Sequence, residues 1–337
     1  MKIESPKVFH IIPSDSLGGV ETAAIRAEAD LKLLMNFDLI VISPESCGWF
    51  KTLIHLFQKI LLVFREHNPT IVTSLWKSHV LGFCLSVVKS DLRWIPFYHS
   101  STHFGKMDTF FSKLSLRCCN NAFVDSRQTG LFIRSFAPKL NLHVIPYVFD
   151  VEAYDQTLNK TIDFIWVGRD DQNKNLLGFV KFCEYMQSIN AKVNIVVVSS
   201  NNIDPGLLES LSNIDSLAIY THLTWEETQK HILNAKLMVC TSFKEGFSMV
   251  SHEALGLGCL PCGNLVSEVH KIIAGKVPQL NSFSSNDFKK FYLEAITLLE
   301  NSNIRNDNVR ICCDLIKNEY PENYIGSFFQ NIKSLQL

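Results

Sequence analysis

The sequence lacks an excess of charge of either sign and lacks long apolar runs. Its 32 Lys and Arg nearly balance its 33 Asp and Glu. The chain therefore has no broad basic field of the kind that binds nucleic acid, and we expect no nucleic-acid partner. Its longest apolar candidate, residues 53–64, is interrupted by polar side chains and is shorter than the roughly 20 residues that span a bilayer. We therefore expect no membrane-spanning helix.

Signals for secretion, disulfides and zinc are also missing. The ten Cys include the adjacent pairs Cys118-Cys119 and Cys312-Cys313, a spacing that does not suit a disulfide framework. No secretory n-region or h-region is found, and no Cys/His cluster has the spacing of zinc ligands. These absences predict a reduced, cytoplasmic protein without a metal site.

The length and the pattern of the chain favour two α/β domains. Its 337 residues are about twice a typical domain, and 47% hydrophobic residues are enough for two cores. In the first half, short apolar runs such as 8–12 and 71–74 alternate with helical patterns such as 22–34. This alternation predicts a parallel, doubly wound sheet, and a second series begins with a strand at 163–167.

The stretch from residue 237 to residue 261 is the most informative part of the chain. Leu237–Cys240 is predicted to be a buried strand and Ser248–Leu255 a helix, with Glu245 in the intervening loop and Glu253 on the helix. The N–H groups of a first helical turn beyond a parallel strand suit a phosphate or a sugar hydroxyl. Two Glu eight residues apart can serve the two ends of one elongated ligand, since a helix rises about 1.5 Å per residue.

The run from Glu245 to Pro261, Glu-Gly-Phe-Ser-x-Val-x-x-Glu-Ala-x-x-x-Gly-x-x-Pro, resembles the Glu-x7-Glu motif of the retaining glycosyltransferases called group 1, family 4-like. The resemblance implies the GT-B fold, in which two Rossmann-like domains face each other across a cleft. It implies an acceptor-binding domain at 1–150, a domain at 151–318 that binds the nucleotide-sugar donor, and a C-terminal helix at 319–337 that packs back on the first domain.

The resemblance also implies roles for the residues of this motif. Glu245 is expected to be catalytic and to face the donor sugar. The backbone of Gly246, Phe247 and Ser248 is expected to hold the sugar hydroxyls, and Glu253 the ribose of the nucleotide. The alternative is a helix-capping loop followed by an ordinary amphipathic helix.

A second motif, Gly168-Arg169-x4-Lys174, follows the predicted strand at 163–167. Two cations and a helix N-terminus at this place can neutralise a diphosphate, and the resemblance implies that they bind the donor diphosphate. A solvated charged turn is the alternative. The chain has no Asp-x-Asp, the motif with which transferases of the other common architecture hold a divalent cation. We therefore expect no metal and no cofactor apart from the nucleotide sugar, with a UDP-sugar favoured over a GDP-sugar.

The first half contributes three further candidates. Gly18 and Gly19 follow the first strand, where a residue without Cβ lets the backbone approach a ligand closely, and the resemblance places them under the donor diphosphate. His99 follows the strand 94–98, and the resemblance implies a catalytic role. Ser126 is predicted to be a helix N-cap rather than a catalyst.

Some positions depart from the family pattern, and one helix has two interpretations. Tyr147 and Val148 replace the usual Asn-Gly, and residues 199–202 replace the usual Gly-x-Gly.

The helix predicted at 51–66 combines apolar side chains with Lys51, His55, Lys59 and Arg65. We interpret its apolar set as core packing with a solvated basic face, because the set is wide enough to be needed against the sheet. Contact with a membrane surface is the alternative.

The resemblance therefore implies a retaining, hexosyltransferase-like enzyme. It would move a sugar from a nucleotide-diphosphate sugar to a hydroxyl of a glycan or lipid-linked acceptor in cell-surface polysaccharide synthesis. Its expected place is the cytoplasm, with peripheral contact at the inner face of the membrane through the N-terminal domain left open. Two alternatives stay open as well: a sugar-nucleotide epimerase on the same fold, and a non-catalytic protein that binds nucleotide sugars.

Overall fold

A computed structural model describes residues 6–15, 18–44, 49–101, 105–150 and 159–336. The chain divides into two compact units, one formed by residues 1–149 with 322–337 and the other by residues 150–321. The final helix thus belongs to the first unit, although the whole second unit separates it from the rest of that unit in the sequence. Among the described helices, none combines the length and the apolar character needed to cross a membrane.

The first unit is built on a parallel sheet with the strand order β2-β1-β3-β4-β5-β6. Strands β1, β3 and β4 are buried along most of their length, as expected when helices cover both faces of a sheet. Their bounds are β1 Val8–Ser14, β2 Phe37–Ser43, β3 Thr70–Ser74, β4 Arg93–Tyr98, β5 Asn121–Val124 and β6 Asn141–Val144.

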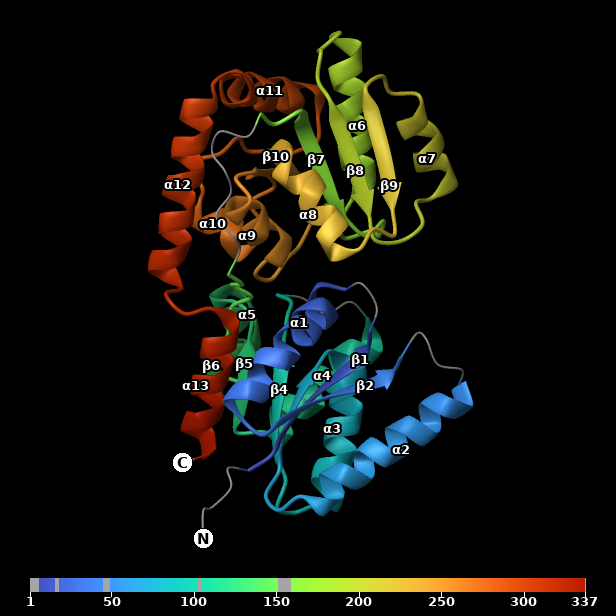
Figure 1. Ribbon diagram of the computed structural model, residues 1–337, viewed down its shortest axis with the longest axis vertical. Coiled ribbons are helices and arrows are strands. Elements are labelled where there is room, and N and C mark those ends of the chain that lie inside the picture. Colours follow the sequence, from blue (N-terminus) through green and yellow to red (C-terminus); the bar gives the residue numbers. More distant parts are fainter. Residues whose placement is uncertain (1–5, 16–17, 45–48, 102–104, 151–158, 337) are drawn as a thin grey trace. The chain divides into compact units, whose positions relative to one another are not determined.

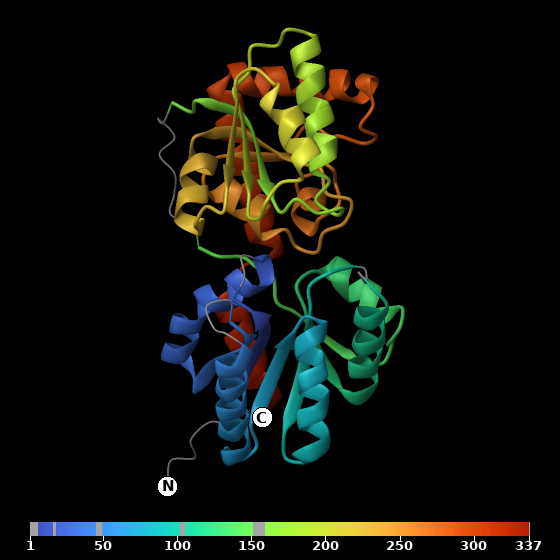
Figure 2. The same cartoon turned by 90° about the vertical axis from the view of Figure 1, so that its right-hand side faces the viewer.

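Helices lie on both faces of this sheet (Figures 1 and 2). Alternate side chains of β1 show the two layers: Phe9 and Ile11 share a core cluster with α2 and α3, whereas His10 stacks on Phe328 of α13. Ser126 accepts a hydrogen bond from the Thr129 amide and caps α5, as predicted from the sequence. The helices are α1 Gly19–Leu34, α2 Trp49–Arg65, α3 Trp76–Val88, α4 Lys106–Cys118, α5 Arg127–Arg134 and α13 Tyr324–Gln336.

The apolar set of α2 does not all pack on the sheet, so our interpretation of that helix was wrong for four of its apolar residues. Leu56, Ile60 and Val63 face the core cluster. A second group, however, is exposed to solvent by 38% to 62%: Leu53, Phe57, Leu61 and Phe64. Periodicity identifies the apolar positions of a helix, but it does not show how wide an arc the neighbouring elements cover.

The second unit has a parallel sheet with the order β11-β10-β7-β8-β9. One face carries an aromatic core in which Phe164 of β7 meets Phe182 and Phe291. The opposite face packs Ile165 and Met238 against residues of α8 and α9, such as Ile232 and Ala254. The strands are β7 Ile162–Gly168, β8 Ile195–Ser199, β9 Leu217–Thr221, β10 Ala235–Cys240 and β11 Leu260–Gly263.

Several helices of this unit begin at a capping side chain. Asn175 caps α6 through the Gly178 amide, and Thr224 with Glu227 forms a capping box at α8. Pro321 follows the end of α12, so the final helix starts at Tyr324 and not at residue 319 as the resemblance implied. The helices are α6 Leu176–Ser188, α7 Pro205–Ser212, α8 Trp225–Leu233, α9 Met249–Gly256, α10 Glu268–Ile272, α11 Ser285–Glu300 and α12 Ser302–Glu319.

Candidate functional site

The strand order of the second unit reverses between β7 and β10. From β7 the chain proceeds to β8 and β9 on one side, and it then returns to add β10 and β11 on the other side. Parallel α/β sheets bind ligands beyond the carboxyl ends of the strands at such a point. Because β7 and β10 pair directly, the two loops predicted to bind the donor, 169–174 and 241–248, leave neighbouring strands.

Lys174 and Glu245 come from these two loops and form an ion pair. The Nζ of Lys174 donates to Oε1 of Glu245 at 2.6 Å, and both side chains are largely buried. Burial alone would lower the pKa of Lys174, but the charge and hydrogen bond of Glu245 raise it above its ordinary value. Burial likewise favours a higher pKa for Glu245, but Lys174 and a hydrogen bond from Ser242 lower it below its ordinary value. Both groups are therefore charged at neutral pH.

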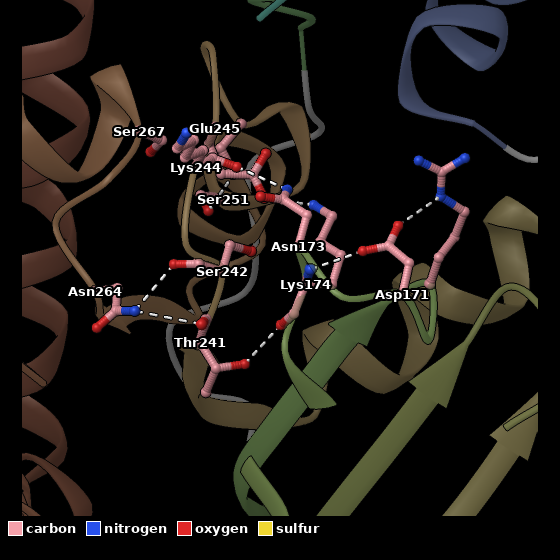
Figure 3. Close-up of polar contacts among 12 residues, drawn as sticks. Asp171, Asn173, Lys174, Thr241, Ser242, Lys244, Glu245, Ser251, Asn264 and Ser267 are labelled. Atoms are coloured by element: carbon pink, nitrogen blue, oxygen red, sulfur yellow. Dashed lines mark hydrogen bonds and ion pairs between the residues drawn. The ribbon is translucent and has the colours of Figure 1, made fainter. Parts of the chain in front are cut away.

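Hydrogen bonds between the two loops fix this pair (Figure 3). The Phe243 amide donates to the carbonyl of Asn173 at 2.8 Å, and the Asn173 side chain donates to the carbonyl of Lys244 at 2.8 Å. The hydroxyl of Thr241 donates to the carbonyl of Lys174 at 2.9 Å. With three cross-links beside the ion pair, the loops behave as one preorganised surface.

Asn264, which follows β11, supports the Glu245 loop from beneath (Figure 3). Its Nδ2 donates to the carbonyl of Thr241 at 3.2 Å and to that of Ser242 at 2.9 Å. In addition, Trp166 Nε1 donates to the Thr241 hydroxyl at 3.0 Å. Asn264 is buried, so these bonds are shielded from water and hold the loop at a fixed height above the sheet.

Arg169 lies at the exposed edge of this surface. Its side chain is 57% accessible, and its Nε is 3.5 Å from the carboxylate of Asp171. The next residue, Asp170, is fixed through its backbone, since its amide donates to Asn201 Oδ1 at 2.7 Å and its carbonyl accepts from Asn201 Nδ2 at 3.1 Å. Asn201 belongs to the segment that departs from the family's Gly-x-Gly, and it anchors the turn that carries Arg169.

The residues predicted to hold the sugar form a tight turn before α9. Gly246 and Phe247 are buried, and their carbonyls accept from the amides of Glu268 and Val269 at 3.0 and 3.4 Å. Ser248 has φ 68° and ψ 77°, which is left-handed backbone and rare for a residue with a Cβ. Asn175, which caps α6, is left-handed as well. Such conformations concentrate at ligand sites, and these two begin the helices whose first turns border the two loops.

Glu253, the predicted ribose ligand, is fully buried on α9. A carboxylate without solvent access cannot meet a ribose until neighbouring groups move. Its assignment therefore stays a prediction, because the geometry shows only that it shares a helix with the turn at Ser248.

His270 is a site residue that the sequence analysis missed. It is fully buried, and burial lowers its pKa to about 4, with Glu245 opposing and Lys174 adding to the shift. Its Nδ1 is 2.7 Å from the hydroxyl of Ser267, which caps α10. Its other nitrogen, Nε2, makes no hydrogen bond to any residue that the structure describes. The only signal in the sequence is a His three positions after a helix-capping Ser, which is too common to be informative.

His99 belongs to a chain of hydrogen bonds in the first unit. Its Nε2 is 3.0 Å from the hydroxyl of Ser74, which is in turn 2.8 Å from Nε2 of His10. The hydroxyl of Tyr147 is 2.8 Å from Nδ1 of His99. Burial, and then the nearby His10 and His79, hold the pKa of His99 well below its usual range. The imidazole is therefore neutral near pH 7, with Ser74 at one of its nitrogens and Tyr147, the departure from the family's Asn, at the other.

Gly18 and Gly19 have different surroundings. Gly18 is buried at the start of α1, and a Cβ built there would meet the carboxylate of Glu21, so a larger residue at this position would displace the Glu21 side chain. Gly19 is exposed with open space around it. These two glycines and His99 belong to the first unit, whereas the other seven predicted site residues belong to the second. Within the described ranges, no group of three or more His, Cys, Asp or Glu is arranged to hold a metal ion.

Solved structures resemble the chain along its whole length. Sucrose-phosphate synthase from Thermosynechococcus elongatus matches with a TM-score of 0.75 and 14% identity over 98% of both chains. The α,α-trehalose 6-phosphate synthase from Burkholderia multivorans matches with a TM-score of 0.73 and 7% identity, over 99% of this chain and 96% of that one. The chain has the GT-B fold. The predicted fold class, two Rossmann-like parallel domains, is thereby confirmed.

A third match is part of a larger protein. Staphylococcus aureus TarM, solved with fondaparinux, α-GlcNAc-glycerol and UDP, has a TM-score of 0.64 and 12% identity, over 80% of this chain and 56% of TarM. The present chain thus spans a little over half the length of TarM. No profile of a known protein family matches the sequence, and no curated protein is found as a relative. At these identities the likeness is one of fold.

Proposed function

We propose that this GT-B protein transfers a sugar from a nucleotide-diphosphate sugar to an acceptor hydroxyl, with retention of the anomeric configuration. The observation that carries the proposal is the preorganised surface that the two loops form beyond the carboxyl ends of the neighbouring strands β7 and β10. It combines Arg169, Lys174 and the first turn of α6 with Glu245, from two loops that are cross-linked to each other. A GT-B fold with this charge distribution suits a diphosphate on one side and a polyhydroxylated group on the other.

In the proposed complex, the donor diphosphate lies on Arg169, Lys174 and the amides at the start of α6. The positive charge is part of the protein. The protein's own side chains would therefore stabilise the leaving diphosphate, and no metal ion would be needed for this step. Lys174 is charge-balanced by Glu245 before the donor binds. Binding would transfer part of the Lys174 interaction to phosphate oxygens and release Glu245 to accept hydrogen bonds from the sugar.

The remaining residues are assigned by position. Backbone groups of Gly246, Phe247 and Ser248 would contact the sugar, and Glu253 the ribose after rearrangement. Gly18, Gly19 and His99 would act from the first unit, with the neutral imidazole of His99 as a hydrogen-bond partner and not as a cation. The leaving diphosphate oxygen would accept the proton of the acceptor hydroxyl on the face of attack, so no side chain need act as a nucleophile.

Two of the similar structures guide the choice of substrates. TarM was solved with UDP and α-GlcNAc-glycerol, and the pneumococcal O-GlcNAc transferase GtfA with UDP and GlcNAc. They support a UDP-sugar as the first donor to test and a glycan or lipid-linked sugar as the acceptor, as would suit cell-surface polysaccharide synthesis in the cytoplasm.

The test begins with calorimetric titration of UDP, GDP and their common sugar conjugates. The donor found in this way is then incubated with an acceptor panel in excess EDTA, and the anomeric coupling of the product is read by NMR. We expect transfer in EDTA with the donor configuration retained. An inverted linkage, or activity that requires added magnesium or manganese, would contradict the proposed chemistry. Conversion of the donor without any acceptor would favour an epimerase.

A further inference from the structure

Helix α2 presents two separate apolar faces, and only one of them is used by the fold. Leu56, Ile60 and Val63 pack on the core, whereas the exposed stripe consists of Leu53, Phe57, Leu61 and Phe64. At about 100° per residue these four side chains fall within an arc of about 80°, so they form one continuous stripe along the helix. Exposed apolar side chains are unremarkable singly, but an aligned stripe of large ones marks a surface that meets an apolar partner.

The charges on α2 identify the kind of partner. The helix carries Lys51, His55, Lys59 and Arg65, and it contains no Asp or Glu. On the same helical projection Arg65 and Lys51 follow the stripe at about 120° and 160°, so cationic groups border the apolar stripe along one side. Long basic side chains at the edge of an apolar face can bury their stems and direct their charge to lipid phosphates. The residues that pack on the core, Leu56, Ile60 and Val63, border the stripe along its other side.

We propose that α2 docks the protein on an anionic membrane surface, with the exposed stripe entering the boundary between headgroups and acyl chains. A helix with this pattern lies in the plane of the membrane, since binding uses both buried apolar area and attraction to anionic lipid. The helix does not span the bilayer, because its other apolar face is committed to the core of the first unit. The proposal is independent of the proposed sugar transfer, because it rests on α2 alone.

The test measures binding of the full-length chain to lipid vesicles by sedimentation. Vesicles of phosphatidylcholine alone are compared with vesicles of phosphatidylcholine and phosphatidylglycerol in equal parts, at low and at high salt. We expect binding to the anionic vesicles that is at least roughly tenfold stronger than to the neutral ones and that weakens as salt screens the basic residues. Absence of binding to the anionic vesicles at low salt would overturn the proposal.

Two double variants separate the apolar and the electrostatic parts. Leu53→Ser with Phe57→Ser should reduce the partition coefficient by roughly tenfold or more, since it removes two of the stripe's apolar groups. Lys51→Gln with Arg65→Gln should reduce binding to anionic vesicles by a similar factor, because each basic residue near an anionic surface contributes about fivefold, and it should leave binding to neutral vesicles unchanged. All four side chains are exposed, so the fold should survive, and circular dichroism verifies it.

Matched controls guard against general effects of hydrophobicity and charge. Leu33→Ser with Leu131→Ser removes two apolar side chains of α1 and α5 that are even more exposed, and Lys289→Gln with Lys290→Gln removes two exposed charges from α11. Both controls should bind vesicles like the unaltered chain. Equal losses in control and α2 variants would overturn the proposal. A second outcome would also overturn the proposal: the unaltered chain does not bind vesicles but forms a dimer in analytical ultracentrifugation, and the Leu53/Phe57 variant abolishes that dimer. The stripe would then pair with a second copy of the chain.

Discussion

Lys174 Nζ lies 2.6 Å from Glu245 Oε1, so the cation assigned to the donor diphosphate and the carboxylate assigned to the donor sugar form one ion pair. The two residues are 71 positions apart, and three further hydrogen bonds hold their loops together. Each group is therefore already neutralised before any substrate arrives. The consequence is that a substitution of one residue changes the charge that the other can offer to a ligand.

The first prediction uses this coupling. Lys174→Met should weaken binding of UDP by about 10- to 100-fold, the usual range for a lost charge-assisted hydrogen bond, and should leave uridine affinity almost unchanged. Glu245→Gln should retain UDP affinity within about threefold or improve it, because Lys174 loses its internal counter-ion, while transfer is lost. Calorimetry with UDP and uridine measures both. If the Lys174 variant lost equal affinity for UDP and for uridine, Lys174 would not contact the diphosphate.

The second prediction concerns Glu253. If this carboxylate accepts hydrogen bonds from ribose, Glu253→Ala should weaken UDP and uridine equally, by about 1 to 3 kcal/mol. Because Glu253 is buried, the substitution will also lower stability, so a control of similar burial is needed. Glu268, which accepts from the Tyr320 hydroxyl at 2.9 Å, serves this purpose. Glu268→Ala should lower the melting temperature but leave uridine affinity intact, and a Glu253 variant that behaves in the same way would refute the ribose assignment.

The third prediction concerns stability at acidic pH. Burial lowers the pKa of His10 and of His79 to about 3, from an ordinary value of 6.5. Each is neutral in the folded state and takes up a proton on unfolding below pH 6.5, so folding stability rises with pH in this range and is lost as pH falls. Each His should contribute a slope of about 1.4 kcal/mol per pH unit between about pH 6.5 and 3.

Urea unfolding of the first unit's transition, measured between pH 7 and pH 4.5, tests this slope. His10→Gln keeps a hydrogen-bonding group near Ser74 but cannot take up a proton, so it should reduce the slope by about one proton. Ser74→Ala removes the hydroxyl partner of His10 but no titrating group, so as the control it should lower stability and leave the slope as it is. An unchanged slope in the His10 variant would mean that this imidazole is protonated in the folded protein.

The fourth prediction concerns the support beneath the Glu245 loop. Asn264→Ala removes the two bonds to the carbonyls of Thr241 and Ser242 and should reduce the rate of transfer by roughly tenfold or more, since Glu245 loses its fixed position. Thr224→Ala removes the capping box of α8 at a cost of about 1 kcal/mol and should leave transfer unchanged. Comparing the two variants by steady-state kinetics separates loss of position from loss of stability.

The sequence predicted the elements whose signals are local. The predicted helix at 22–34 lies within α1, the predicted strand at 163–167 lies within β7, and the Ser126 cap was recognised, because each depends on residues a few positions apart. Residues 22–34 contain neither Gly nor Pro, which is enough to place a helix. The two-domain α/β architecture follows from the same local alternation.

The rest depends on contacts that no local pattern encodes. Neither the Lys174–Glu245 pair nor the link from His10 through Ser74 to His99 could be predicted, because each joins residues from different strands whose order in the sheet must be known first. The exposure of Phe57 had the same cause: its neighbours in space are set by the packing angle of α2. His270 was missed because its distinguishing property, complete burial, arises only in the folded chain.

The placement of α13 constrains how the protein can be made. Tyr324 donates its amide to the carbonyl of Val148 at 2.7 Å, and the ring of Phe328 packs against Phe123. The first unit therefore includes residues 322–337, which leave the ribosome only after all of residues 150–321. During synthesis the sheet face that receives Phe328 stays uncovered while the second unit is already able to fold. Nascent chains stalled at residue 321 should hence depend on chaperones, and a fragment that ends at residue 149 should aggregate unless the final helix is supplied as a separate peptide.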